Sequence, residues 1–312
     1  MKLSSDQAAQ WLLKGQIVAV PTETVYGLAV SLKYPKKIKE VFELKGRPHD
    51  NPLIVHVATI SQLKKLVQSI PKSFFKIKSL WPGPLTIVFK ANLKAVPSKV
   101  RAGLKTVAIR IPDHPQLLTL LKKTGPIAAP SANVSGRPSP TTRRHVESDL
   151  GAEFPVLDGG ACRHGVESTV ISLDDDSWQL LRLGAVPPCD IESKLGEAAK
   201  TKTNRKKPVS PGQKYRHYAP LARLRLCFDA KTFKRYNKFK KYQAVLGFSD
   251  TKTDKPMMSL GKRHRFASNL KKLYASLREL DRKGYKDVLV DMDFTVSGLG
   301  ETLYERLIKA AG

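Results

Sequence analysis

The stretch LKGRPHDNPLIVHV, residues 44–57, joins the end of a helical pattern to a strand pattern through a cationic loop. Before it, apolar residues recur at three- and four-residue spacing over residues 38–45, which is typical of a helix. After it, residues 54–57 form a short apolar run of the kind that becomes a buried strand. The two cations, Lys45 and Arg47, flank Gly46, and such a pair can clamp a triphosphate if both side chains point the same way.

Strand and helix patterns alternate in the same manner over the first two-thirds of the chain. Strands are expected at residues 16–20, 54–57, 85–90, 106–111, 126–129, 167–173 and 179–183, and helices at 34–45, 60–68 and 114–123. This order predicts an α/β or α+β fold with mixed strand directions.

The pattern breaks down between residues 196 and 220, where residues 200–208 are charged and lack apolar periodicity. We therefore predict three parts: a catalytic domain at 1–199, a linker at 200–220 and a small domain at 221–312. The last part has strand patterns at 223–228, 244–248 and 287–292 and helical patterns at 266–282 and 301–311. It is expected to be Rossmann-like, but it has no glycine-rich phosphate motif, so no nucleotide site is assigned to it.

Composition excludes several classes of protein. With 41% apolar and 26% charged residues, the chain is neither collagen-like, coiled-coil nor wholly disordered. No run approaches the roughly 18 apolar residues of a membrane helix, and the N-terminus lacks a signal peptide's apolar centre, so a cytoplasmic location is expected. The three cysteines lie far apart, which argues against a disulfide framework or a cysteine-rich zinc site and indicates reduced, buried thiols.

The chain is strongly basic, with 55 lysines and arginines against 27 aspartates and glutamates and a formal net charge of +28. Charge of this size concerns partners and solubility rather than fold. Nucleic acid, phosphorylated ligands and adaptation to a lysine-rich proteome all remain open as explanations.

Five segments are rich in groups that bind anions or small polar ligands. They are PTETVYG at 21–27, LKGRPHDNPL at 44–53, WPGPLT at 81–86, PSANVSGRPSPTT at 130–142 and GVESTV at 165–170. Ser131 and Asn133 offer a hydroxyl and an amide on one side of a turn. Taken singly, each segment is equally consistent with turn and cap chemistry, because serine, asparagine, glycine and proline populate any turn.

Together, these segments resemble the YrdC-like proteins, whose Lys-x-Arg…Ser-x-Asn signature is present as Lys45, Arg47, Ser131 and Asn133. The motifs cover about residues 5–220, and the run at 210–220 looks like the linker of the long, two-domain form. The resemblance implies a YrdC-like twisted mixed sheet with flanking helices and a small Rossmann-like C-terminal α/β domain. Two departures stand out: Ser172 replaces an aspartate that is frequent in relatives, and Gln213 replaces a methionine.

The resemblance also implies an activity. Such proteins condense L-threonine, bicarbonate or CO2 and ATP into a threonylcarbamoyl adenylate and pyrophosphate, for the N6-threonylcarbamoyladenosine at position 37 of tRNA. We therefore expect a nucleotidyltransferase that uses Mg2+ held mainly by the ATP phosphates, with no metal ligands of its own. Besides its substrates, tRNA and the machinery that transfers the threonylcarbamoyl group are possible partners, and no membrane is expected.

Site residues carry over from the family position by position, with Lys45 and Arg47 as the catalytic cations. The ATP-binding residues implied in this way are Lys45, Arg47, Asn51, Thr106, Asn133, Thr141, Arg182 and Tyr218. The threonine-binding residues are Thr24, His56, Arg110, Ser131 and Ser168. The chemistry agrees for Arg110, because an arginine in the apolar run Ile109–Ile111 needs an anion such as a carboxylate. His56 taken alone fits a satisfied core histidine equally well.

Aromatic and cationic residues are unusually dense at 210–220, in an otherwise featureless linker. We hypothesise that this segment covers the site, with Tyr218 near the triphosphate, because a lid would protect a product that water destroys. An RNA-binding module remains an alternative on charge. An O-carbamoyltransferase related to hydrogenase maturation proteins is disfavoured, because the cysteine-rich zinc segments of those proteins are missing. The role of the C-terminal domain and the oligomeric state stay open.

Overall fold

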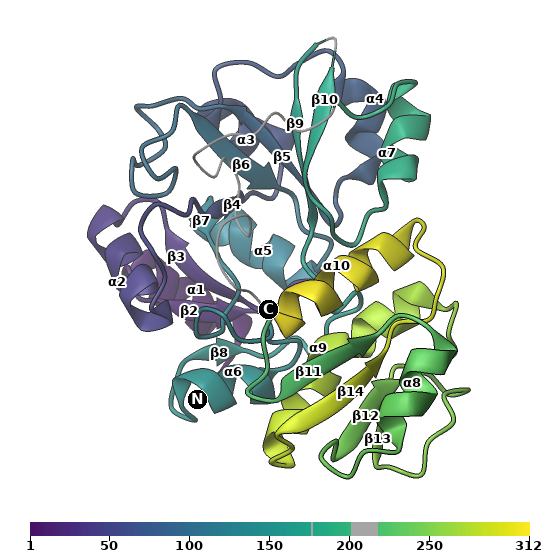
Figure 1. The fold of residues 1–312 in the computed structure, drawn as a ribbon. Coiled ribbons are helices and arrows are strands. Elements are labelled where there is room, and N and C mark those ends of the chain that lie inside the picture. Colours follow the sequence, from purple (N-terminus) through teal and green to yellow (C-terminus); the bar gives the residue numbers. More distant parts are fainter. Residues whose placement is uncertain (176, 201–217) are drawn as a thin grey trace.

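Two separate sheets organise the computed structural model, which describes residues 1–175, 177–200 and 218–312 (Figure 1). In the described residues, the first sheet has ten strands in the order β1-β8-β2-β3-β7-β4-β6-β5-β9-β10. Parallel and antiparallel pairs alternate irregularly along it, so the sheet is mixed, as expected. The strands are β1 (Lys2–Leu3), β2 (Val18–Val20), β3 (Gly27–Ser31), β4 (Ile54–His56), β5 (Leu85–Lys90), β6 (Thr106–Arg110), β7 (Ile127–Ala128), β8 (Val156–Leu157), β9 (Thr169–Leu173) and β10 (Trp178–Arg182).

Helices cover both faces of this sheet. They are α1 (Ser5–Leu13), α2 (Pro35–Lys45), α3 (Ile60–Leu66), α4 (Phe74–Ile77), the 3-10 turn η1 (Lys78–Leu80), α5 (Pro115–Thr124), α6 (Arg143–Leu150) and α7 (Pro188–Leu195). Leu12 of α1 and three leucines of α5 lie in one core, and α2, α3, α4 and α7 contribute to a larger core. Because Ile191 and Leu195 of α7 belong to that larger core, the first domain extends through α7.

Side-chain alternation gives the two faces of β4 and β6 different chemistry. Val55 and Ile109 point into the large core. Since successive side chains of a strand point to opposite faces, His56 and Arg110 lie on the other face. They are directly opposite each other in the parallel register of the two strands. A buried histidine and a buried arginine therefore stand side by side on a sheet face that the large core does not occupy.

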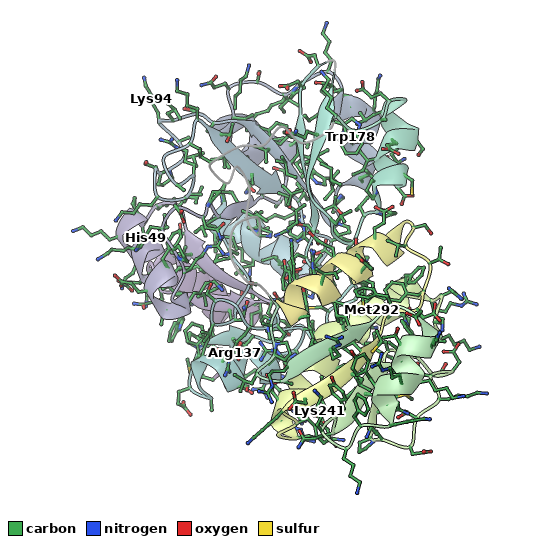
Figure 2. All side chains as sticks on the ribbon, in the orientation of Figure 1. His49, Lys94, Arg137, Trp178, Lys241 and Met292 are labelled. Atoms are coloured by element: carbon green, nitrogen blue, oxygen red, sulfur yellow. The ribbon has the colours of Figure 1, made fainter. Side chains whose placement is uncertain are left out.

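The C-terminal domain is a four-stranded parallel sheet with the order β11-β14-β12-β13. Its elements are β11 (Arg223–Cys227), α8 (Ala230–Asn237), β12 (Ala244–Gly247), β13 (Met257–Ser259), α9 (Phe266–Arg282), β14 (Asp287–Asp291) and α10 (Leu299–Ala311). Lys241 lies at the outer edge of this domain, and Lys94 lies at the opposite edge of the molecule (Figure 2). Figure 1 shows α10 between the two sheets, close to the ends of β9 and β10.

The predicted fold class is confirmed, and most predicted elements lie within two residues of the observed ones. The sequence patterns did not predict β1, α1, β3, α4, α6, β8 and α7 in the first domain or α8 and β13 in the second. Two of the three cysteines, Cys162 and Cys227, are buried as expected. Cys189, the second residue of α7, is exposed. In the part of the chain that the structure describes, no helix is long and apolar enough to cross a bilayer.

We predict that Gly184→Ala destabilises the first domain by about 2–3 kcal/mol, as overpacking of a rigid backbone does. A methyl group there would meet only backbone atoms within 2.5 Å, namely the Thr169 nitrogen, the Ser168 carbon and the Glu167 oxygen. The measurement is the melting temperature. Gly196→Ala is the control, because its left-handed backbone is disfavoured for alanine but nothing obstructs the added carbon, so it should cost only about 1 kcal/mol. Equal losses in the two variants would contradict the prediction.

Candidate active site

A pocket of about 710 Å³, counted to its open mouth, lies on the sheet face that carries His56 and Arg110. It is lined by residues of the strands β3, β4, β6 and β10 and of the loops beside the sheet. The lining consists of Thr22, Thr24, Val25, Gly27, Arg47, Pro52, Leu53, Ile54, His56, Arg110, Ala129, Pro130, Ser131, Asn133, Arg137, Ser139, Glu167, Ser168, Arg182 and Tyr218.

Sheet register brings these distant segments together. Ser131 pairs with Gly27 across an isolated antiparallel bridge, which places the 129–133 turn against the loop that ends at Gly27. Ser168 immediately precedes β9, whose Thr169 pairs with Leu85 at the start of β5. Four of the five segments that were singled out in the sequence therefore line one pocket, and the fifth, 81–86, lies behind it, where the Gly83 carbonyl bonds Arg110 and the Thr86 hydroxyl bonds Ser168.

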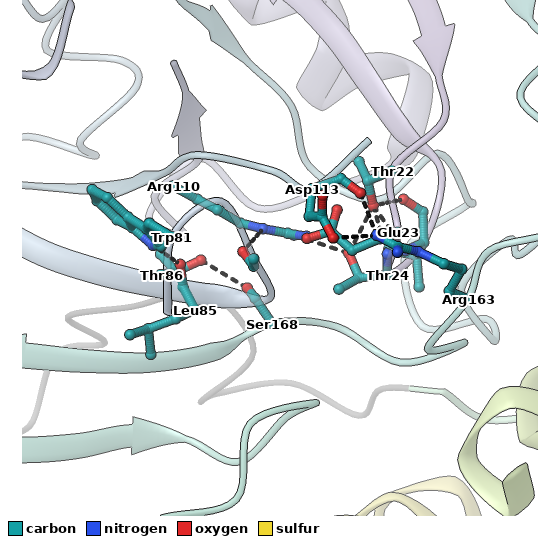
Figure 3. A network of polar contacts seen from close by, with 12 residues as sticks. Thr22, Glu23, Thr24, Trp81, Leu85, Thr86, Arg110, Asp113, Arg163 and Ser168 are labelled. Atoms are coloured by element: carbon teal, nitrogen blue, oxygen red, sulfur yellow. Dashed lines mark hydrogen bonds and ion pairs between the residues drawn. The ribbon is translucent and has the colours of Figure 1, made fainter. Parts of the chain in front are cut away.

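Arg110 is 3% exposed and is fixed by three different groups (Figure 3). Its Nη2 lies 2.5 Å from Glu23 Oε1, its Nη1 donates to Thr24 Oγ1 at 2.9 Å, and its Nε donates to the Gly83 carbonyl at 3.1 Å. Burial alone would raise the pKa of Glu23, but the charge of Arg110 lowers it below the usual value. The pair is therefore ionised, and the guanidinium is held rigidly at the pocket wall.

Thr24 is in turn oriented by Thr22. The two hydroxyl oxygens lie 2.7 Å apart, and the Thr22 hydroxyl also accepts the Thr24 and Val25 amides at 3.0 and 3.1 Å. A hydroxyl that is fixed from both sides offers a ligand a defined hydrogen-bonding direction. Thr22 was not among the predicted site residues.

His56 is buried beside Arg110, and its Nδ1 has no partner at hydrogen-bonding geometry within the described residues. Burial, together with the neighbouring Arg110 charge, lowers the pKa of His56 to about 3. The ring is therefore neutral near pH 7. A neutral imidazole next to an arginine can hydrogen-bond a ligand without repelling the guanidinium.

Lys45 and Arg47 do not point the same way, contrary to the expectation of an extended cation pair. Lys45 is the last residue of α2, and Gly46 ends the helix in the left-handed conformation, so the chain reverses between the two cations. The Lys45 ammonium is buried beneath the 131–133 turn and donates to the carbonyl oxygens of Ser131 and Asn133 at 2.5 and 2.6 Å. Arg47 alone of the two lines the pocket.

Burial lowers the pKa of Lys45 well below its usual value, and the Arg47 charge lowers it further. An ammonium so placed is stabilised by an anion that enters nearby. Lys45 thus fixes the backbone of the turn that carries Ser131 and Asn133, and its charge favours an anionic ligand in the pocket.

Arg182 and Ser168 form the wall on the side of β9 and β10. The Arg182 Nη2 donates to the Ser168 carbonyl at 2.8 Å and to its hydroxyl at 3.1 Å. The Ser168 hydroxyl lies 2.7 Å from that of Thr86, which is a residue of β5 (Figure 3). Burial lowers the pKa of Arg182, so an anion that enters the pocket would relieve an unfavourable desolvation.

The structure gathers nine of the predicted site residues at the pocket surface. The five threonine-site predictions, Thr24, His56, Arg110, Ser131 and Ser168, all line it, as do Arg47, Asn133, Arg182 and Tyr218 from the nucleotide set. Lys45, Asn51, Thr106 and Thr141 do not line it. Thr106 begins β6, four residues before Arg110, so roughly 13 Å of extended strand separate the two. Thr141 is buried against His145, with its hydroxyl 3.2 Å from Nδ1.

The proposed lid at 210–220 falls mostly on residues 210–217, which lie outside the described residues. The described part contains Tyr218, which does line the pocket. Sequence reasoning also left Glu167 and Arg137 without a role, although both stand inside motifs that had been singled out. Glu167 could have been found from the sequence, because it is a charged residue directly before Ser168, a predicted threonine-binding residue.

Charge distinguishes this pocket from an ordinary polar cavity. Within the described residues, its lining contains four arginines, Arg47, Arg110, Arg137 and Arg182, but a single carboxylate, Glu167. Such an excess of cations in a partly desolvated site favours anionic ligands.

Comparisons with known proteins agree with this description. The family model described as "Telomere recombination" (Sua5, YciO and YrdC proteins) matches residues 10–184, and the model described as "Threonylcarbamoyl-AMP synthase, C-terminal domain" matches residues 186–312. The fold and the site thus define a two-domain protein of the Sua5 and YrdC class.

Individual relatives show which proteins of this class are similar to the chain over its whole length. A threonylcarbamoyl-AMP synthase of Bacillus subtilis is 41% identical over 98% of this chain and 92% of its own length. That of Pyrococcus abyssi is 40% identical over 98% and 93%. The crystal structure of P. abyssi Sua5 complexed with L-threonine superimposes with a TM-score of 0.89 at 37% identity, over 100% of this chain and 96% of that one. The chain belongs to the threonylcarbamoyl-AMP synthase family.

We predict that the His56 ring takes up no proton between about pH 5 and pH 8, because its pKa in the folded protein is about 3. In the unfolded chain the ring binds a proton near pH 6.5, so this site lowers the free energy of unfolding as the pH falls from about 6.5 towards 3. Histidine NMR spectra measure the titration, and His56→Gln assigns the signal. A His56 resonance with a midpoint between about pH 5.5 and 7.5 would refute the prediction.

Proposed function

We propose that the pocket binds L-threonine, bicarbonate and ATP and condenses them to threonylcarbamoyl-AMP and pyrophosphate. The enzyme is a transferase that forms an AMP adduct. The main support for assigning the reaction to this pocket is its four arginines, which lie beside ordered hydroxyls. The reaction needs such cations because a carboxylate, a carbamate and a triphosphate must all be neutralised in one place.

The threonine end of the site is the wall formed by Arg110, Thr24 and His56. The Arg110 guanidinium pairs with Glu23 and lines the pocket, so we assign the ligand carboxylate to the N–H groups that its protein partners leave over. The oriented Thr24 hydroxyl and the neutral imidazole of His56 then provide contacts for a second polar group, such as the amine or hydroxyl of threonine.

We assign the nucleotide end to other groups of the lining, namely Arg182, Arg47, Asn133 and Tyr218. The threonine amine attacks bicarbonate to give a carbamate, with loss of water. A carbamate oxygen then attacks the α-phosphorus, and the bond to the bridging oxygen breaks to release pyrophosphate. Positioning and charge neutralisation carry such phosphoryl chemistry, so fixed arginines at both ends are the groups that this reaction needs.

We propose that Mg2+ enters on the phosphates of ATP. In the described residues, no three histidine, cysteine, aspartate or glutamate side chains lie close enough together to hold a metal. Glu167, the carboxylate in the lining, already accepts hydrogen bonds from Ser139, Tyr274 and Arg306. When bound, the ion would neutralise part of the triphosphate charge and favour departure of pyrophosphate.

The assignment predicts that purified protein releases pyrophosphate only when threonine, bicarbonate and ATP with Mg2+ are all present, and without any RNA. Arg110→Lys should lower kcat/KM for threonine about 100-fold, because an ammonium lacks the planar fork with which Arg110 holds Glu23, Thr24 and the Gly83 carbonyl while it lines the pocket. The loss should appear mainly as a higher KM for threonine. Enzyme-coupled detection of pyrophosphate measures both.

Arg101→Lys is the matched control for this variant. Arg101 is also an arginine bonded to backbone carbonyls, those of Val96 and Leu104, but it lies outside the pocket lining. It should retain the full rate. No pyrophosphate release by the wild-type protein would overturn the proposed function, and full activity of Arg110→Lys would overturn the threonine assignment.

A second activity, direct binding of tRNA, is favoured by the surface of α8. Six exposed cations occur within eleven residues there, with no acidic residue between them: Lys231, Lys234, Arg235, Lys238, Lys240 and Lys241. Phe239 is 42% exposed among them, and the Arg225 guanidinium lies 4.6 Å from the ring centroid of Tyr236. Cations interleaved with exposed aromatic rings suit a polyanion with unstacked bases.

Lys231, Lys234 and Lys238 follow one another at three- and four-residue spacing, so they form one stripe along α8. Their triple replacement by glutamate should weaken tRNA binding and reduce the slope of log K against log salt by about 2–3. Fluorescence anisotropy at several salt concentrations measures this. The control is the same replacement of Lys64, Lys65 and Lys78, which are exposed on the first domain and change the net charge equally. Equal losses in both variants would leave tRNA binding without a preferred surface and contradict the proposal.

A further inference from the structure

Two side chains of the C-terminal domain reach the wall of the pocket in the first domain. Tyr274 lies on α9 and Arg306 on α10, and both are fully buried. The Tyr274 hydroxyl donates to Glu167 Oε2 at 2.8 Å, and the Arg306 Nε donates to the same oxygen at 3.2 Å. Because Glu167 lines the pocket, these bonds connect the second domain directly to the site.

Glu167 is held from its own domain as well. The Ser139 hydroxyl donates to Oε1 at 2.6 Å, so three donors from three segments orient one carboxylate. Burial alone would raise the pKa of Glu167, but the charges of Arg306 and Arg182 and the hydrogen bonds lower it below its usual value. The carboxylate is therefore ionised inside a pocket whose ligands are anions.

Arg306 also fixes the strand that carries Arg182. Its Nη2 donates to the carbonyl oxygen of Leu183 at 2.7 Å, one residue beyond Arg182. Its Nη1 contacts the Glu305 carboxylate. One guanidinium thus ties Glu167, which precedes Ser168, to the end of β10. These are the two chain segments that meet in the bond between Arg182 and Ser168.

Tyr218 is a third residue of the pocket, after Glu167 and Arg182, whose position depends on the C-terminal domain. Its ring stacks on Tyr274 with centroids 5.3 Å apart, and the Arg306 guanidinium lies 4.7 Å from its centroid. Its backbone has a φ of 66°, a conformation that a residue with a side chain adopts only when its surroundings hold it there. Packing against α9 and α10 supplies that constraint on a residue that lines the pocket.

We propose that Arg306 and Tyr274 are positioning residues for the nucleotide end of the pocket, so that the C-terminal domain completes the active site. Arg306 neutralises Glu167 and thereby leaves Arg182 to bind Ser168 and the triphosphate. Without Arg306, the ionised Glu167 draws Arg182 towards itself, or Glu167 takes up a proton and can no longer accept the hydrogen bonds from both Ser139 and Tyr274; both changes displace groups at the nucleotide end and weaken binding of ATP. The inference rests on the proposed function, because that function defines which end receives the nucleotide.

The test compares Arg306→Met and Tyr274→Phe with the full-length wild-type enzyme in the pyrophosphate assay. Each should raise the KM for ATP about tenfold and change the KM for threonine less than twofold. Arg306→Met should also move the acid limb of kcat/KM for ATP to higher pH, because Glu167 keeps its burial but loses its largest opposing charge. Tyr274→Phe removes a single hydroxyl and keeps the ring, so it remains informative if Arg306→Met does not fold.

Thr302→Val is the matched control, because Thr302 lies one turn before Arg306 on α10 and its buried hydroxyl donates across the same interface to the Gly184 carbonyl at 2.9 Å. It should keep the wild-type KM for ATP and the wild-type acid limb. Arg306→Lys should restore the acid limb, because it restores the charge. An ATP KM that rises equally in Thr302→Val, or that stays unchanged in Arg306→Met and Tyr274→Phe, would overturn the inference.

This outcome is separable from failure of the proposed function. If the wild-type protein released no pyrophosphate, calorimetric titration with ATP and Mg2+ would still compare the same variants. Weaker ATP binding in Arg306→Met and Tyr274→Phe, but not in Thr302→Val, would support the positioning role. Equal affinities in all four proteins would reject it.

Discussion

The arrangement of the molecule follows from a single electrostatic constraint, which is that cations must be kept charged and ordered inside a partly desolvated pocket before any anion arrives. Burial disfavours the charged form of each, as the lowered pKa values of Lys45 and Arg182 show. Each buried cation is accordingly surrounded by fixed acceptors. Arg110 has Glu23, Lys45 has two backbone carbonyls, and Arg182 has the Ser168 carbonyl and hydroxyl. The acceptors orient the cations without fully neutralising them, which leaves a net positive field for the ligands.

Two buried carboxylates, Glu23 and Glu167, each pair with a buried arginine. Glu23 pairs with Arg110 at one end of the pocket, and Glu167 pairs with Arg306 at the other. The two differ in where their partner originates, because Arg110 belongs to the same domain as Glu23, whereas Arg306 belongs to the second domain. One end of the site is therefore complete within the first domain, and the other depends on how α9 and α10 pack against it. The second domain therefore contributes to the structure of the site through its bonds to Glu167.

The sequence predicted the strands with the strongest apolar patterns almost residue by residue, such as β5 and β6, because their burial on both faces leaves little ambiguity. It missed α6, whose residues are largely polar, and α8, whose apolar positions are few. The family resemblance named nine of the residues that line the pocket, but it did not show that Lys45 turns beneath the 131–133 loop. That geometry follows from the left-handed Gly46, a backbone property that a residue pattern does not encode. Contacts such as Glu167 with Arg306 join positions 139 residues apart, and no local pattern signals them.

The large positive charge of the chain has two separate origins in the structure. The pocket accounts for only a few of the 55 lysines and arginines, and these are fixed at least in part by protein acceptors. Most of the others that the structure describes are exposed. At physiological ionic strength, where screening acts over about 8 Å, isolated surface charges influence small ligands in the pocket very little. Exposed cations act strongly only on a partner that meets several of them at once. A pocket for small anions therefore does not explain the charge of the surface, whereas the cluster on α8 has the spacing of cations that the proposed binding of tRNA requires.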